Sequence, residues 1–232
     1  MTAAEIKYIK SLSQKKFRDE YGVFVVEGEK LVQEALDSGF EVERVYRKDD
    51  IGEAAMSRIS ALSSPSPVLA VVRKPDAIYV APSDGLYLAL DGIRDPGNLG
   101  TILRIADWFG IDAVYASEDT VELFNPKVVQ STMGAIFRVK YHVADIPAMC
   151  SAFGGKVYGT FLDGENMYQK SLDTSAAIIV IGNEANGISK ETAACVTDRL
   201  YIPPYPVGEP GSESLNAAVA TAVTVAEFRR RG

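Results

Sequence analysis

Two regions with different hydrophobic patterns divide the chain. In the first, residues 3–12 form an amphipathic stretch that predicts a helix with a basic face. Apolar runs at 23–26, 42–46 and 68–72 predict strands, and residues 29–36, which are closed by Gly39, predict a second helix. This order of elements predicts a small α/β unit.

Turn-forming residues mark the end of this first region. The segment SSPSP lies at 63–67, and KPD (74–76) and PSDG (82–85) flank a short apolar run at 78–80. We therefore expect a first domain over residues 1–80 and a second over residues 85–232.

Strand and helix signals alternate through the second region. Strands are predicted at 86–90, 113–115, 156–160 and 177–181. Helices are predicted at 99–109, 126–133 and 216–230. Such alternation is typical of a mostly parallel sheet with crossover helices, so the predicted fold class is α/β.

Composition narrows the classes of protein that remain. The chain is 47% hydrophobic and 24% charged, as in ordinary globular proteins, and no apolar run is long enough to span a membrane. The N-terminus lacks the apolar core of a signal peptide, and Cys150 and Cys195 form no disulfide framework. We therefore expect a soluble cytoplasmic protein with no membrane partner.

His142 is the sole histidine. This argues against a histidine-rich metal site and against a Ser-His or Cys-His catalytic pair. The sequence therefore predicts chemistry that uses neither a metal nor histidine.

The net charge of −7 is unevenly distributed. The first 18 residues sum to +4 and the remainder to −11; the charged residues of the first segment are Lys7, Lys10, Lys15, Lys16 and Arg18 against Glu5. Overall acidity is a poor footprint for a nucleic-acid binder, although a local basic segment can contact phosphates. On charge alone, a solvated helix face is the favoured interpretation.

The segment 90–110 is the first with candidate chemistry. A strand ends at Asp91, a loop containing Gly97 follows, and Asn98 is a suitable N-cap for the next helix. Arg104 lies about 150° from the centre of the apolar stripe of that helix, where a lone arginine is usually only solvated. However, ligands of α/β sheets bind where this loop is expected, outside the carboxyl ends of strands. The stripe consists of Ile102, Ile105, Ala106 and Phe109.

A second candidate segment is 176–189. An apolar strand runs directly into Gly182, and Glu184 follows. Glycine at a strand end lets a ligand approach the backbone, and a carboxylate there can orient a polar group. The alternative is a strand-to-helix turn in which Glu184 is merely solvated.

The third segment is 201–228. A strand end at Tyr201 and Ile202 meets a loop with four prolines and two glycines, and Ser214 and Asn216 precede a helix of small residues. Taken singly, Ser214 or Asn216 is most simply an N-cap.

Together, in this order and spacing, the three segments resemble the motifs of the SpoU/TrmH family of RNA ribose 2′-O-methyltransferases, in the SPOUT superfamily. The first motif, N-x-G-x-x-x-R, is matched by Asn98, Gly100 and Arg104. The second, G-x-E-x-x-G-x-S, is matched by Gly182, Glu184, Gly187 and Ser189. The third, I-P…S-L-N, is matched by Ile202, Pro203, Ser214, Leu215 and Asn216. The likeness covers residues 86–230, and 128–139 also resembles the family's segment between the first two motifs.

This resemblance implies a trefoil-knotted methyltransferase domain, S-adenosylmethionine as methyl donor, an RNA substrate and a homodimer. The implied catalytic residues are Arg104, Asn98, Glu184, Ser214 and Asn216. The implied cofactor-binding residues are Gly182, Ile202 and Leu215, with Thr160 and Leu162 as weaker candidates. Family accounts make Arg104 a general base, whereas a guanidinium with a pKa above about 12 stays protonated and could bind a phosphate instead. The sequence leaves both roles open.

The N-terminal region is similar, more loosely, to the ribosomal-protein-like substrate domain that many members carry. That similarity implies RNA binding by the basic start, through Lys7, Lys15, Lys16 and Arg18. It favours ribosomal RNA over transfer RNA, because the N-terminal domain resembles that of rRNA-modifying members.

One departure and two rival functions remain open. The loop between Ile202 and Ser214 is longer than in the family pattern, so its cover over the cofactor, and any intrusion of Glu209 or Glu213, is not predicted. A non-catalytic RNA-binding or ribosome-assembly factor is one rival, although a binder has no need of the intact catalytic motifs. A nucleotide-binding enzyme of another class is the second, but G-x-G-x-x-G and G-x-x-x-x-G-K-[ST] are both missing.

Overall fold

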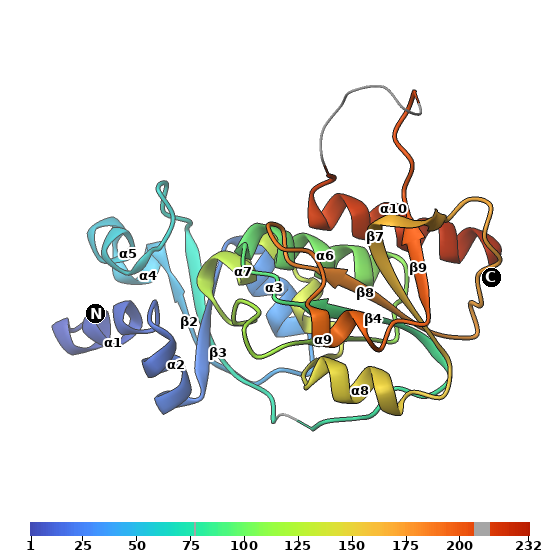
Figure 1. Ribbon diagram of the computed structural model, residues 1–232. Coiled ribbons are helices and arrows are strands. Elements are labelled where there is room, and N and C mark those ends of the chain that lie inside the picture. Colours follow the sequence, from blue (N-terminus) through green and yellow to red (C-terminus); the bar gives the residue numbers. More distant parts are fainter. Residues whose placement is uncertain (77, 207–213) are drawn as a thin grey trace. The chain divides into compact units, whose positions relative to one another are not determined.

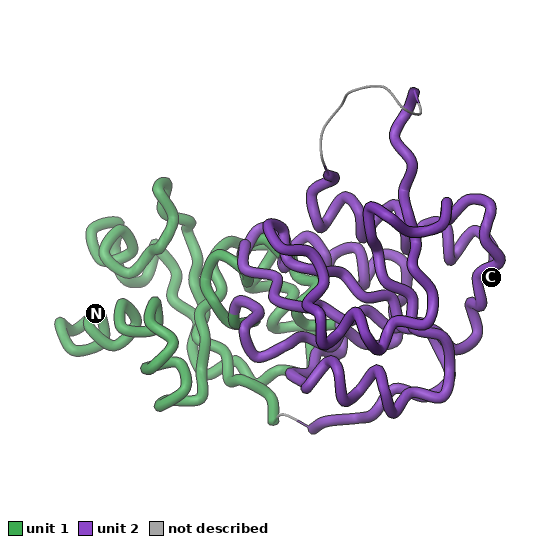
Figure 2. The backbone as a smooth tube through the Cα atoms, in the orientation of Figure 1, with its two compact units in different colours: residues 1–77, 122–138 green, residues 78–121, 139–232 purple. Residues whose placement is uncertain are grey.

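The computed structural model describes residues 1–76, 78–206 and 214–232. Contacts divide the chain into two units, one formed by residues 1–77 with 122–138 and the other by residues 78–121 with 139–232 (Figure 2). The boundary expected at 80–85 would assign residues 122–138 to the second domain, whereas their contacts lie in the first unit.

The first unit is built on a three-stranded antiparallel sheet with strand order β1-β3-β2 (Figure 1). Its strands are β1 (Val23–Glu27), β2 (Val42–Arg47) and β3 (Val68–Arg73). Its helices are α1 (Ala3–Ser11), α2 (Lys15–Tyr21), α3 (Glu29–Asp37), α4 (Lys48–Ile51), α5 (Glu53–Ile59), α7 (Pro126–Thr132) and the 3₁₀ helix η1 (Ala135–Phe137).

Alternation along the strands gives this sheet two apolar faces. Leu69 and Val71 pack with residues of α1 and α5, and Ala70 and Val72 pack with residues of α3. Residues 122–138 complete the second face. They contribute Val129 and Ile136 as buried residues, with Leu123, Phe124 and Phe137 packed beside them.

The second unit contains a six-stranded sheet in which every neighbouring pair is parallel, with strand order β6-β5-β4-β8-β7-β9. The predicted α/β class with a mostly parallel sheet is therefore confirmed. The strands are β4 (Gly85–Asp91), β5 (Ala113–Ala116), β6 (Tyr141–Val143), β7 (Lys156–Asn166), β8 (Ala176–Gly182) and β9 (Asp198–Tyr201). The helices are α6 (Pro96–Trp108), α8 (Ile146–Ala152), α9 (Lys190–Ala193) and α10 (Ala217–Arg231).

Helices cover both faces of this sheet (Figure 1). On one face Ala89 and Val180 pack with Met149 of α8. On the other, Tyr158 contacts Phe228 of α10 edge-on, with ring centroids 5.0 Å apart. Both faces of the central strands are therefore buried, which explains their near-continuous apolar sequences. None of the helices in the described part of the chain has the length and apolar character that a bilayer span requires.

Helix α6 begins earlier than the sequence predicts. Its N-cap is Asp95, whose side chain accepts a hydrogen bond from the backbone N–H of Asn98, so Asn98 lies inside the first turn instead of capping it. The apolar run 78–80 forms no strand and is exposed.

Candidate active site

The carboxyl ends of four neighbouring strands place the candidate residues along one edge of the parallel sheet. In the register of β4 and β8, Asp91 lies opposite Gly182. Thr160 of β7 lies opposite Leu200 of β9, which ends just before Ile202. Because this is the edge where α/β sheets bind ligands, it is the candidate site.

A hydrogen-bonded chain of three side chains joins the three motifs at this edge. Asn98 donates from Nδ2 to Glu184 Oε1 at 2.8 Å. Its Oδ1 accepts from Nδ2 of Asn216, also at 2.8 Å. Asn98, the middle member, is buried, whereas Glu184 and Asn216 at the two ends are exposed.

Local structure holds each member of this chain in place. Asn98 is fixed by the first turn of α6, and Asn216 is the N-cap of α10, with Oδ1 accepting from the backbone N–H groups of Ala218 and Val219. The backbone N–H of Arg94 lies 3.5 Å from the second carboxylate oxygen of Glu184. Both ends of each amide are therefore engaged, which fixes their orientation.

Two residues that the sequence analysis did not select tie the loops of the site together. Asn183 donates from Nδ2 to the carbonyl oxygen of Gly92 at 2.6 Å, while its Oδ1 accepts from the backbone of Ala185 and Asn186. Asp91 accepts from the backbone N–H of Ser189 at 2.7 Å. An asparagine followed by turn residues is the usual signal of an Asx turn, and that signal is present in the sequence GNEANG.

Gly182 is required by the chain itself. A Cβ atom at this position would lie 2.3 Å from the carbonyl carbon of Gly187 and from the backbone nitrogen of Ile188. The absence of a side chain at Gly182 therefore lets the backbone of residues 187 and 188 pass close to the end of β8.

Arg104 and Ser214 stand apart from the three-residue chain. Arg104 is exposed, as its helical position predicts, and lies about 9 Å further along α6 than Asn98. Ser214 is exposed as well. Within the described residues, neither side chain hydrogen-bonds to Asn98, Glu184 or Asn216, and their catalytic roles stay predictions.

The predicted cofactor residues differ in their exposure, and their role stays a prediction. Thr160 and Ile202 are half-buried, while Leu162 is 70% exposed and Leu215 is 49% exposed. Glu209 and Glu213, whose intrusion on the cofactor was left open, lie within 207–213, outside the described residues.

The basic N-terminal residues differ in their accessibility. Lys7, Lys15 and Lys16 are exposed, with Lys15 paired to Asp19, and their contact with RNA stays a prediction. Arg18 is only 2% exposed.

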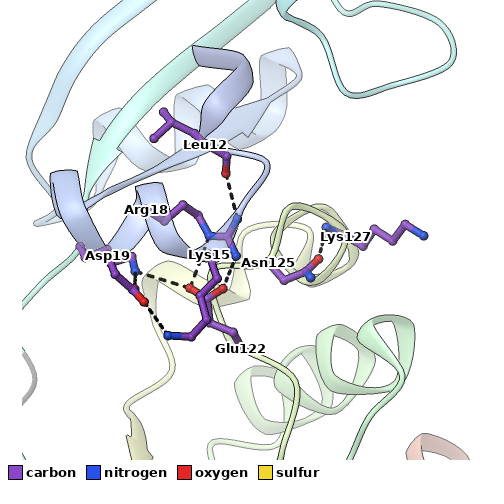
Figure 3. A network of polar contacts seen from close by, with 8 residues as sticks. Leu12, Lys15, Arg18, Asp19, Glu122, Asn125 and Lys127 are labelled. Atoms are coloured by element: carbon purple, nitrogen blue, oxygen red, sulfur yellow. Dashed lines mark hydrogen bonds and ion pairs between the residues drawn. The ribbon is translucent and has the colours of Figure 1, made fainter. Parts of the chain in front are cut away.

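The guanidinium of Arg18 is fully engaged inside the first unit (Figure 3). Nη1 donates to the carbonyl oxygen of Leu12 at 2.8 Å, Nε lies 3.4 Å from Glu122 Oε1, and Nη2 pairs with the other carboxylate oxygen. Lys74 lies between Glu122 and Asp19 and pairs with both. The expectation that Arg18 contacts RNA is therefore corrected, because a buried guanidinium needs such partners and is not free to bind phosphate.

The site suits positioning chemistry. The amides of Asn98 and Asn216 and the carboxylate of Glu184 are oriented at the strand ends. Arg104 lies further along α6, the helix that carries Asn98. Such groups can orient a hydroxyl and a phosphate.

Comparison with known proteins agrees with this arrangement. The description "SpoU rRNA Methylase family" matches residues 85–226, and "MRM3-like substrate binding domain" matches residues 3–74. A curated relative, the 23S rRNA (guanosine(2553)-2′-O)-methyltransferase RlmP of Bacillus subtilis, is 32% identical over 97% of this chain and 96% of its own length.

Solved structures give the same result. A protein of the TrmH family from Porphyromonas gingivalis superposes with a TM-score of 0.88 and 38% identity, covering 100% of this chain and 99% of that one. An AdoMet-bound rRNA methyltransferase from Sinorhizobium meliloti superposes with a TM-score of 0.89 and 29% identity, covering 100% and 96%.

Proposed function

This chain belongs to the SpoU rRNA methylase family, and from that premise we propose that it methylates a ribose 2′-hydroxyl of ribosomal RNA, with S-adenosylmethionine as methyl donor. The observation that carries the proposal is the chain of hydrogen bonds through Asn98, Glu184 and Asn216. It joins one side chain from each of the three motifs at the ligand-binding edge of the sheet.

The strand ends fit the cofactor. Leu162 and Leu215 leave apolar surface exposed, and Gly182 and Ile202 offer backbone groups at the ends of β8 and β9. Apolar side chains with a few backbone polar groups are the usual surroundings of a purine ring. We propose that these residues, with Thr160, hold the donor. When bound, S-adenosylmethionine supplies a sulfonium methyl group that is already activated for attack by a weak nucleophile.

The protein's own residues must then align the ribose and handle its proton. Alignment in a near-attack geometry can contribute roughly 7–11 kcal/mol. Hydrogen bonds hold Asn98 and Asn216 for this alignment. Glu184 orients Asn98 by accepting a hydrogen bond from Nδ2 of Asn98. Ser214, which belongs to the third motif, is proposed to contact the ribose.

Arg104 is proposed to act on the substrate directly from its exposed position on α6. A protonated guanidinium there can bind the phosphate next to the target ribose and stabilise the developing alkoxide. A pH–rate profile that stays flat to high pH would support this role against that of a general base.

The first unit is proposed to bind the RNA. Its residues 3–74 match a substrate-binding domain, and Lys7, Lys15 and Lys16 lie exposed on α1 and α2. Ribosomal RNA is favoured over transfer RNA because a relative that covers 97% of this chain, at 32% identity, is named for 23S rRNA. We also propose that the protein acts in the cytoplasm, because it is similar to a bacterial 23S rRNA methyltransferase.

We further propose a homodimer and a trefoil knot. Trp108 of α6 is 85% exposed and Val219 of α10 is 49% exposed, and these two helices pack on each other, so a second copy could cover their apolar surface. Sedimentation equilibrium, which measures the mass of the assembly in solution, tests the proposed homodimer. The support for the knot is the family alone, and a structure traced through residues 201–216 tests it.

The test of function is transfer of labelled methyl groups from S-adenosylmethionine to total RNA from cells that lack the gene. The RNA is fractionated by size and digested with nuclease to locate the label on ribose. We predict label in the large ribosomal RNA with the native chain, and a loss of at least about 100-fold with Arg104→Ala, because the variant removes a group aligned with the reacting atoms.

The outcomes separate the alternatives. Label confined to the tRNA fraction would redirect the proposal to transfer RNA. Absence of both label and S-adenosylmethionine binding would overturn the methyltransferase assignment in favour of a non-catalytic RNA-binding factor.

A further inference from the structure

Strand β7 makes a short excursion at the ligand-binding edge. Thr160 and Glu165 both pair with Leu200 of β9, so residues 161–164 interrupt the regular pairing within β7; we call these four residues the 161–164 excursion. Gly164 lies so close to β9 that a Cβ atom would be 2.5 Å from the carbonyl carbon of Leu200. The base of the excursion is therefore closed by backbone contact.

Arg199, the residue before Leu200, holds the two sides of the excursion. Its guanidinium carbon lies 3.5 Å from the centroid of the Phe161 ring, which is a cation–π contact. Nη2 of the same guanidinium forms an ion pair with Asp163, and this hydrogen bond lowers the pKa of the Asp163 carboxyl. Arg199 thus contacts both neighbours of Leu162 in the sequence, Phe161 and Asp163.

The strand that carries Arg199 is itself anchored. Asp198 accepts from Lys170 at 3.0 Å and from Lys156 at 3.2 Å, and Leu200 is completely buried. The backbone that carries Arg199 is therefore held in place, so the contacts of Arg199 with Phe161 and Asp163 can order the 161–164 excursion as well.

We propose that Arg199 is a positioning residue for the methyl donor, holding the 161–164 excursion so that Leu162 is presented to the adenosyl group before it binds. Leu162 is 70% exposed although both of its neighbours in the sequence contact Arg199. This inference rests on the proposed function, because it takes S-adenosylmethionine as the occupant of this edge. It assigns to Arg199 a role that none of the three motifs covers.

The physical benefit is preorganisation. A segment that is already ordered does not lose its conformational entropy when the ligand binds, and each immobilised side chain otherwise weakens affinity. Removal of these Arg199 contacts is expected to weaken S-adenosylmethionine binding about three- to tenfold. RNA affinity and the rate constant at saturating donor should hardly change, because Arg199 makes no described hydrogen bond or ion pair with Asn98, Glu184 or Asn216, and the basic residues proposed to bind RNA belong to the other unit.

A purely structural surface contact is the alternative. Exposed ion pairs often contribute nothing measurable, and in that case Arg199 would matter to stability alone or to nothing. Arg73 provides a matched control, since it is similarly exposed and pairs with Glu41 and Glu43 in the first unit.

The experiment compares the full chain with Arg199→Ala, Arg199→Lys, Asp163→Asn and Arg73→Ala. Titration calorimetry with S-adenosylmethionine gives Kd, methyl-transfer kinetics give KM for donor and RNA separately, and hydrogen exchange reports order at residues 161–165. We expect a raised donor Kd and faster exchange in R199A, smaller effects in R199K and D163N, and none in R73A. R199K should be intermediate because lysine keeps the ion pair but lacks the planar stacking group.

Three results would overturn the proposal: a donor Kd for R199A within twofold of the native value, equal losses in donor and RNA affinity, or an equal effect in R73A. Should R199A fail to fold, R199K and D163N decide the question on their own. Failure of the proposed function is distinguishable, because the native chain would then neither bind S-adenosylmethionine nor methylate RNA.

Discussion

At the scale of single residues, Asn98 uses both ends of its side-chain amide. Replacing it with alanine leaves Glu184 without its donor at 2.8 Å and Asn216 without its acceptor at the same distance. Both partners are then free to reorient, and small misplacements of aligned groups are costly in rate. We predict that Asn98→Ala lowers kcat about 100-fold with less effect on KM for RNA.

Asn125 provides the control for that prediction. It caps α7 in the first unit through Oδ1, which accepts from the backbone N–H of Lys127 at 2.9 Å. Asn125→Ala should cost about 1 kcal/mol of stability, as the loss of an N-cap does, and leave kcat unchanged. If steady-state kinetics gave the two variants the same kcat, the role of Asn98 in the site would be refuted.

Single residues also show how far the sequence could be interpreted. The motifs identified Asn98, Glu184 and Asn216, but Asn216 could be taken as either an N-cap or a site residue; in the structure it caps α10 and also donates a hydrogen bond to Asn98. Arg18 could not be told from its lysine neighbours. Its burial depends on Glu122, which lies 104 residues away, and no local pattern contains that information.

At the scale of elements, α10 ends in an arginine cluster that fixes it to the rest of its unit. Arg229 donates to the carbonyl oxygen of Phe109, and Arg231 donates to that of Met167. Glu227, which is 6% exposed, accepts from Arg230 at 2.8 Å and from Arg231 at 2.6 Å. The last turn of the helix is therefore held by charge-assisted hydrogen bonds, which are the stronger kind.

This cluster gives stability a defined dependence on pH. Hydrogen bonds from Arg230 lower the pKa of Glu227 from 4.5 to about 2, and burial opposes this shift. Because the folded pKa is the lower one, the stabilisation is complete above pH 4.5 and is lost as the pH falls towards 2. We predict that between these values the native chain loses stability more steeply than Glu227→Gln, as measured by urea unfolding.

Glu165 is the matched control for the acid effect. It pairs with Lys170 at 3.0 Å but is 72% exposed, so Glu165→Gln should follow the native chain at every pH. Parallel acid profiles for the native chain and E227Q would show that the α10 cluster contributes nothing.

Element prediction succeeded where one pattern dominated. The long apolar strands β4 and β8 were predicted within one residue of their ends, because both faces are buried. Strand β9 was recognised only at its end, since Leu200 is its one buried residue. The buried face of α6 includes Leu99 and Leu103 in place of Ile105 and Phe109. That difference follows from where α10 packs, which helical spacing does not specify.

At the scale of the whole molecule, sequence order misassigns one segment. Residues 122–138 follow β5 of the second unit along the chain, yet they pack in the first unit. Val129 and Ile136 join the buried cluster around Phe24, and Glu122 neutralises the buried Arg18. The turn-forming residues between 74 and 85 separate two sequence patterns. Such residues report only the local direction of the chain, and they do not indicate which hydrophobic core the later helix α7 packs into.

The first unit should therefore not fold from residues 1–80 alone. Each fully buried Val or Ile side chain contributes about 1.5–3 kcal/mol, so the loss of Val129 and Ile136 approaches the total stability of a small domain. Without Glu122, Arg18 would also be a buried charge with no counter-ion.

We predict no cooperative thermal transition for fragment 1–80, whereas a fusion of 1–76 to 122–138 through a glycine–serine linker should show one by circular dichroism. Replacing Phe124 and Ile136 with serine in that fusion should abolish the transition, since both pack on the Phe24 cluster. A sharp transition in fragment 1–80 would mean that the residues before position 80 form a complete core and that 122–138 merely cover it.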